Sequence, residues 1–289
     1  MCSACPRRKR ELLPTNALMI RRPAFSAQAA RHAGSTAPWG WAALGAVLGL
    51  SFALLWFAPS AWLAQSVAAA TAGQVQLLDA RGTAWTGSAR VLLSGGAGSR
   101  DQAVLPGRLD WQLRPAWGGF RLQIHAECCT AQPVQARITP SLRGVSVQVD
   151  DGSSQWPAAL LAGLGTPWNT VQAEGSLQLV THGLSLAWFE GRLVMGGRTE
   201  LLALGMSSRL STLKPMGSYR IILTGGSAPV LELSTIEGSM QLSGTGRWVG
   251  PRLRFEGVAS AAPEHEAALA NLLNIIGRRN GARSIITLG

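Results

Sequence analysis

The sequence predicts a mainly β protein, with a single N-terminal transmembrane helix followed by a curved, mostly antiparallel β-sheet domain that contains one or two short helices. Three observations predict this fold class. An uncharged apolar run begins at Trp39, apolar and polar residues alternate from Val75 onward, and glycine-rich turns separate the alternating segments. Alternation with period two is typical of strands that bury one face.

The transmembrane helix is predicted over residues 39–64. This stretch has no charged residue, and about 20 apolar residues are enough for a helix to cross the hydrocarbon core. Trp39, Trp41 and Trp62 stand near its ends and are the expected membrane-interface anchors, because indole rings favour that depth. A cleaved signal peptide is the alternative, but the apolar run is longer than the apolar region of a usual signal.

The distribution of charge orients this helix. The net charge is +11, and much of it precedes residue 39, where Glu11 is the only acid. The positive-inside rule therefore predicts a cytoplasmic N-terminus. Residues 1–38 are expected to form a short, disordered cytoplasmic tail, with Met19 as the expected initiator, and residues 75–289 to form the domain on the far side. The basic residues before residue 39 are Arg7, Arg8, Lys9, Arg10, Arg21, Arg22 and Arg31.

The composition argues against nucleic-acid binding. Only 14% of the residues are charged, and beyond the tail the arginines are scattered singly, without aromatic residues interleaved in a basic stripe. Nucleic-acid-binding surfaces gather Lys and Arg on one face, so no nucleic-acid partner is expected. The low charge and the 34 glycines instead favour a β protein that faces apolar surroundings.

The far-side domain is predicted to contain roughly a dozen strands. They follow one another at short intervals, and this spacing is typical of a sandwich, a barrel or a long curved sheet. Gly-Gly pairs and Asp150-Asp151-Gly152 mark the turns between them. Two helices are predicted, over Trp156–Leu164 and Ala262–Ile276, each with a proline at its start. Arg283–Leu288 is predicted as a final strand. The clearest alternating segments are residues 109–113, 122–125, 145–149, 177–179 and 253–255.

The four cysteines do not predict a metal site. Cys2 and Cys5 precede the apolar run, and no second pair follows at a zinc-like spacing. Cys128 and Cys129 fall on the far side, which in a bacterium is the oxidising periplasm. As neighbours they can form a strained disulfide, remain two free thiols, or pair with another chain, and the sequence leaves these alternatives open.

No catalytic, cofactor or metal site is predicted. The sequence contains no nucleophile-elbow, HExxH or phosphate-loop motif. His265 lies between Glu264 and Glu266, and three consecutive residues cannot share one helix face as metal ligands do. The chain is therefore expected not to be an enzyme. Four tryptophans are expected to be core or sheet-packing residues rather than to anchor a partner: Trp85, Trp117, Trp168 and Trp188.

Four segments across roughly residues 40–289 carry a resemblance: Leu77–Ala89, Leu105–Pro115, Leu210–Leu223 and Glu264–Gly289. They resemble protein N of the bacterial type II secretion system, and LLNIIGRR in the last segment is the most specific match. The resemblance implies a non-enzymatic accessory component of the apparatus that exports folded periplasmic proteins. It implies a single-pass inner-membrane protein whose partners are other secretion components and membrane lipid. The chain is also reminiscent of AsmA-like proteins, which carry lipid along a taco-shaped sheet.

Two modes of action follow as expectations. The first is contact with another secretion component by strand addition at open edges of the sheet, to be probed along Leu184–Val194 and Gln241–Val249. The alternative is a periplasmic groove that binds or shields lipid. No other small-molecule ligand is expected.

Overall fold

The computed structural model describes residues 39–96, 98–250 and 252–289. The chain divides into two units, Met1–Gly49 and Leu50–Gly289, which are described separately. The expectations for the tail 1–38, for Met19 and for the Cys2–Cys5 pair fall outside the described residues.

Helix α1 spans Trp39–Trp56 and has no buried residue. Within the described part of the chain, α1 is the one helix that is long and apolar enough to cross a membrane. Pro59 precedes a second helix, α2 (Ser60–Ala70), where its fixed φ suits the approach to a first helical turn. The segment predicted as a membrane helix, residues 39–64, therefore contains α1, a short break and the first turn of α2.

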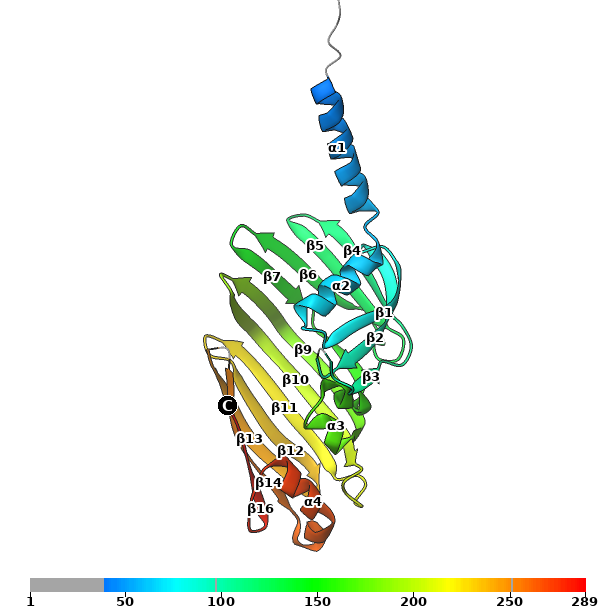
Figure 1. Ribbon diagram of the computed structural model, residues 1–289. Helices are drawn as coiled ribbons and strands as arrows, with labels where there is room; N and C mark the ends of the chain where they lie inside the picture. The colour runs from blue at the N-terminus through cyan, green and yellow to red at the C-terminus, as the bar shows by residue number, and fades with distance from the viewer. Residues whose placement is uncertain (1–38, 97, 251) are drawn as a thin grey trace, which may run out of the picture. The chain divides into compact units, whose positions relative to one another are not determined.

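The unit Leu50–Gly289 is built on one antiparallel sheet of 16 strands (Figure 1). The strands follow one another in chain order for most of the sheet, with β1 at one edge and β15 at the other. Two strands leave this path, since β3 pairs with β2 and β8 pairs with β9. The strands are β1 (Val75–Gly82), β2 (Thr86–Ser94), β3 (Gln102–Val104), β4 (Leu109–Ala116), β5 (Gly119–Ala126), β6 (Val134–Ser141), β7 (Gly144–Val149), β8 (Gly152–Pro157), β9 (Ala173–Phe189), β10 (Arg192–Ser208), β11 (Gly217–Gly226), β12 (Val230–Gly238), β13 (Met240–Val249), β14 (Arg252–Ala261), β15 (Arg278–Asn280) and β16 (Arg283–Leu288).

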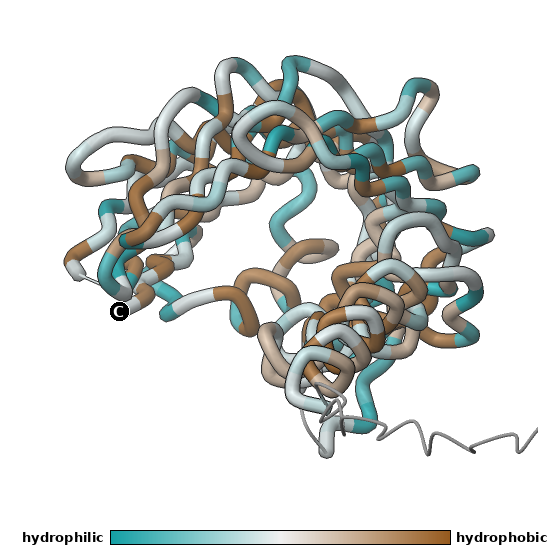
Figure 2. Tube along the Cα trace, turned by 90° about the horizontal axis from the view of Figure 1, so that it is seen from above, coloured by the Kyte–Doolittle hydropathy of each residue, from teal (hydrophilic) through white to brown (hydrophobic). Residues whose placement is uncertain are grey.

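The predicted fold class is confirmed, and of the forms considered the chain adopts the single curved sheet. Figure 2 shows the sheet bending through an arc, with hydrophobic and hydrophilic residues alternating along its strands. The bend has a local cause in the two longest strands, β9 and β10, where the register shifts between Gly196 and Arg198. A β-bulge of this kind bends the strand and increases its twist.

The helices agree only partly with prediction. The C-terminal helix begins as a 3₁₀ turn, η2 (Pro263–His265), and continues as α4 (Glu266–Ile276), within the predicted range. The helix predicted over Trp156–Leu164 is wrong at its start, because Trp156 and Pro157 pair with β9 as the end of β8. The remainder is a 3₁₀ helix, η1 (Ala158–Leu164), and the short α3 (Trp168–Val171) was not predicted.

The buried core lies where these helices meet the sheet. Leu269, Leu272 and Leu273 of α4 pack on Met216, Met240 and Ala259. Toward the other edge, Ala158 of η1 and Val171 of α3 belong to a cluster with strand residues Leu177, Ala203 and Tyr219. A third cluster places Leu160 of η1 with Leu105, Ala126 and Cys129. The helices thus cover one end of the strands on one face of the sheet.

Candidate functional site

One face of the sheet is apolar from strand to strand. Directly opposed residues of antiparallel strands share a face, so the register assigns side chains to faces. Leu113 lies opposite Leu122, which lies opposite Ala136, which in turn lies opposite Val149. A second row continues the pattern through Leu179, Leu201, Ile221 and Leu233. We call this surface the apolar face.

The opposite surface is polar, and we call it the polar face. Gln112, Gln123 and Gln135 lie opposite one another across β4, β5 and β6. Arg220 of β11 lies on this face and forms an ion pair of 2.7 Å with Glu200. The two faces differ because apolar and polar residues alternate along each strand. The register between strands then places apolar residues opposite apolar ones and polar residues opposite polar ones.

The apolar face includes buried hydroxyl groups, and two of them lack a partner in the described part of the chain. The hydroxyl oxygens of Thr199 and Tyr219 are buried without a hydrogen-bond partner among the described residues. Burial raises the pKa of Tyr219, because the charged phenolate loses its hydration. The environment beneath the helices is therefore of low polarity.

The apolar face contains a cavity at the point along β9 where its neighbouring strand changes from β7 to β8. The cavity there has a volume of about 750 Å³, within the range of small-ligand sites. Its floor is apolar, and the segments 130–133 and 150–154 contribute its more polar rim. The apolar lining consists of Leu109, Ile124, Val134, Val149, Trp156, Leu179 and Leu184. Such a cavity suits an apolar ligand.

The cysteine pair lies beside this cavity. The structure joins Cys128 and Cys129 in a disulfide between adjacent residues. Cys128 is exposed, whereas Cys129 is buried and packs with Leu105 and Leu160. Thr130, the next residue, lines the cavity and bonds through its hydroxyl oxygen to the Nδ1 atom of His125 at 3.0 Å.

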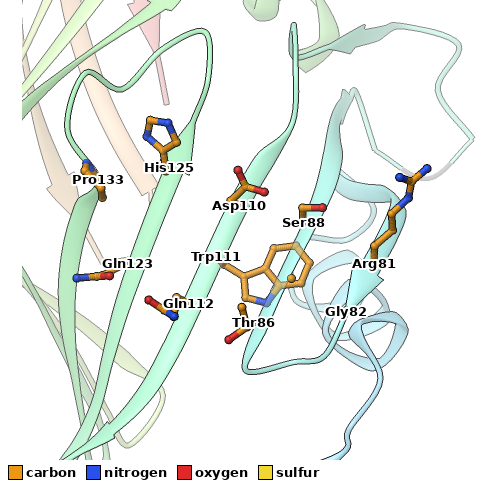
Figure 3. Close-up of a pocket in the computed structure, with 11 residues that line it drawn as sticks. Arg81, Gly82, Thr86, Ser88, Asp110, Trp111, Gln112, Gln123, His125 and Pro133 are labelled. Atoms are coloured by element: carbon orange, nitrogen blue, oxygen red, sulfur yellow. The ribbon is translucent and has the colours of Figure 1, made fainter.

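A second, shallower pocket of about 550 Å³ opens near β1, β2, β4 and β5 (Figure 3). Ser88, Asp110 and His125 lie in one row across it, with Asp110 in the middle. A nucleophilic triad needs the histidine between serine and carboxylate, and neighbouring strands lie about 4.8 Å apart, so His125 is too far from Ser88 to take its proton. Ser88 instead accepts a hydrogen bond from Arg108. This pocket offers no nucleophile–base pair among its lining residues.

The predicted interface anchors lie in different helices. Trp39 and Trp41 are exposed on α1, and Trp62 is exposed on α2. The prediction that the other named tryptophans are core or sheet-packing residues is wrong for Trp117, which is fully exposed, while Trp168 and Trp188 lie outside the buried core. Trp85 is half-buried, and its indole nitrogen donates a 2.9 Å hydrogen bond to the Leu55 carbonyl. Position in hairpin turns or beside them explains the exposure of Trp117 and Trp188.

The segments chosen for probing strand addition lie mostly inside the sheet, although Arg192–Val194 extend beyond the pairing of β10 with β11, which begins at Met195. Residues 184–194 form the end of the β9–β10 hairpin, and β7 pairs with β9 on its outer side. Residues 241–249 belong to β13, which lies between β12 and β14. Sequence alternation marks strands but does not reveal which strands lie at an edge, because edge and interior strands carry the same pattern.

Comparison with known proteins identifies a family for this chain. A family model described as type II secretion system (T2SS), protein N, matches residues 73–286. The match begins just before β1 and ends within β16, so it covers the sheet except for Thr287 and Leu288. No curated protein and no solved structure matches the chain significantly.

Proposed function

The chain belongs to the family of type II secretion system protein N, and from this premise we propose how its β domain acts. Membership implies an accessory role in type II protein secretion, and α1 fits a single-pass component of the inner membrane. In our proposal the segment before α1 lies in the cytoplasm and residues 75–289 form a periplasmic domain. That domain acts without enzymatic chemistry, by contact with other secretion components.

The proposed orientation is supported by the basic residues that precede α1 and by the uncharged helix itself. In spheroplasts, added protease should digest the β domain, while a tag at residue 1 remains protected until the membrane is opened. Digestion of the tag before permeabilisation would contradict the orientation.

The partner contact is proposed at the free edge of β16. The β1 edge is unsuited to strand addition, because α2 packs on β1 and the strand is bulged between Leu78 and Arg81. At the other edge β15 pairs only with residues 283–285. Within the described chain, Ile286–Leu288 have no strand on that side. An extended segment of another component can continue the sheet there through backbone hydrogen bonds.

Photocrosslinking tests this contact. The photoreactive residue p-benzoylphenylalanine at Thr287 is expected to crosslink to another secretion component in cells that assemble the apparatus. Thr245 is the matched control, because it is exposed on the same face, in the same cross-strand row through Glu256, but on the interior strand β13. Equal crosslinking from both positions, or none from Thr287, would contradict strand addition at this edge.

Lipid binding is a second candidate function, and the cavity of about 750 Å³ on the apolar face favours it. An acyl chain would contact Leu179 and Leu184 while its polar end faced the rim. Gentle extraction followed by mass spectrometry is expected to find bound lipid in the wild type. Leu184→Asp should abolish this lipid, because a carboxylate in an apolar cavity is costly.

The control for this experiment is Ser185→Asp, one residue further along β9 and so on the other face. It should leave the lipid bound. Loss of lipid from both variants, or bound lipid in Leu184→Asp, would argue against the cavity as the binding site.

A further inference from the structure

The hairpin turns at one end of the sheet expose unusually large apolar side chains. Antiparallel connection places the β1–β2, β4–β5, β6–β7 and β9–β10 turns at the same end of their strands (Figure 1). Trp117 in the β4–β5 turn and Leu142 in the β6–β7 turn have relative exposures of 105% and 107%. We call residues 114–121, 137–145 and 188–193 the hairpin rim.

The rim also exposes the apolar face. Val145, Trp188 and Leu193 lie opposite one another on β7, β9 and β10. Trp188 and Leu193 have relative exposures of 53% and 57%, whereas the helices cover the apolar face at the other end of the strands. Contiguous exposed apolar residues are uncommon on soluble surfaces and mark interaction sites.

A row of arginines lies at the same end of the strands but on the polar face, two residues along each strand from Gln112, Gln123 and Gln135. Arg114, Arg121 and Arg137 lie directly opposite one another on β4, β5 and β6, and all three are exposed. None of the three forms an ion pair with a carboxylate of the described residues. Like charges placed directly opposite one another destabilise a sheet. An anionic partner would relieve this repulsion, and Arg143 beside Leu142 adds a fourth positive charge.

The rim is continuous with the end of the apolar helix. Trp56 and Phe57 line a small pocket together with Trp85, Leu113 and Pro115. The rings of Trp85 and Phe120 lie 6.0 Å apart, and Trp85 donates a hydrogen bond to the Leu55 carbonyl at 2.9 Å. Leu113 and Pro115 of β4 therefore line the same pocket as the last residue of α1, and Trp117 follows Pro115 by two residues. Leu50–Trp56 of α1 belong to the same unit as β4, so a bilayer that contains these last residues of the helix comes close to the β4–β5 turn.

We propose that the hairpin rim binds the surface of an anionic phospholipid bilayer. Trp117 and Leu142 enter the interfacial layer, where indole rings are favoured, and the arginine row contacts lipid phosphates. This combination of apolar tips with unpaired guanidinium groups is the pattern of a surface that lies on a membrane. This proposal requires α1 to be a membrane helix, but it does not require the partner contact at β16. Membrane binding by the hairpin rim and the contact at β16 can therefore fail independently.

Photocrosslinking of the full chain in inner-membrane vesicles tests the proposal. The photoreactive residue p-benzoylphenylalanine at Trp117 or Leu142 is expected to give phospholipid adducts, detected by mass spectrometry. Thr212, exposed in the connection between β10 and β11 at the opposite end of the strands, is the control and should give none. Adducts with protein alone at Trp117 and Leu142 would make the rim a protein interface and overturn the proposal. Equal lipid adducts at Thr212 would also overturn it.

A charge series tests the arginine row in proteoliposomes that contain anionic phospholipid. Arg114→Gln, Arg121→Gln and Arg137→Gln combined should lower the lipid-adduct yield at Trp117 by roughly fivefold or more, because each guanidinium near an anionic surface contributes about that factor to binding. Circular dichroism verifies that the variant folds. The matched control combines Arg100→Gln, Arg278→Gln and Arg283→Gln, which removes equal charge at the other end of the strands. Its yield should stay at the wild-type level, and equal loss in both variants would overturn the role of the row.

Discussion

Replacing Leu272 with alanine is expected to lower the free energy of unfolding by about 2–5 kcal/mol. Leu272 is 1% exposed and packs from α4 onto the sheet beside Met216, Met240 and Ala259. Removal of its side chain loses apolar burial and leaves a cavity that rigid strands cannot close. The effect should be large because α4 is the main cover of the apolar face at the C-terminal end of the sheet.

Ile275→Ala is the matched control for this prediction. Ile275 lies on the same helix but is 43% exposed, so its replacement should cost less than about 1 kcal/mol. Denaturant unfolding of the detergent-solubilised chain, followed by tryptophan fluorescence, measures both variants. A loss in Leu272→Ala no greater than that in Ile275→Ala would mean that α4 does not pack tightly on the strands.

Replacing Gly197 with alanine is expected to destabilise the domain by about 2–5 kcal/mol, the sum of two costs. Gly197 has φ +79, a left-handed conformation in which a Cβ atom is disfavoured. A Cβ atom there would also collide with the backbone carbonyl of Gly183 on the neighbouring strand. The bulge would have to open, and because it bends β9 and β10 the curvature of the sheet should change with it.

Gly183→Ala separates these two costs. Gly183 also has a left-handed conformation, with φ +56, but an added Cβ atom would meet nothing within 4 Å. Its replacement should therefore cost only about 1–2 kcal/mol, from the backbone conformation alone. The two variants are compared by the same unfolding measurement. Equal costs would show that the strands at the bulge are looser than the close approach of Gly197 and Gly183 indicates.

Much of the fold could be predicted because its signals are local. Alternation identifies a strand from its own residues, and the apolar run from Trp39 identifies a membrane-competent helix. The helix pattern before Ile276 and the final strand Arg283–Leu288 were likewise readable from nearby residues. Trp156 and Pro157 were misassigned because their pairing with β9 overrides a local helix-start signal.

The candidate sites were far less predictable. The scattered arginines gave no basic stripe in the sequence, yet Arg114, Arg121 and Arg137 meet across three strands. Trp117 was expected to be a core or sheet-packing residue, but the turn between β4 and β5 exposes it. The signal available in the sequence was the presence of arginine and large apolar residues close to the predicted turns. The alternating pattern alone does not distinguish these exposed residues from residues of the core.

The apolar helix and the strands can be read from the amino-acid sequence, because each depends on residues close together in the chain, and the family is recognisable from several short segments. The folded chain was needed to show that the strands form one curved sheet, which edge is free, and which surfaces the helices leave uncovered. These properties depend on register, since a shift of one residue would turn every side chain of a strand to the other face. Register joins residues far apart in the chain, and it alone aligns the apolar face and the arginine row.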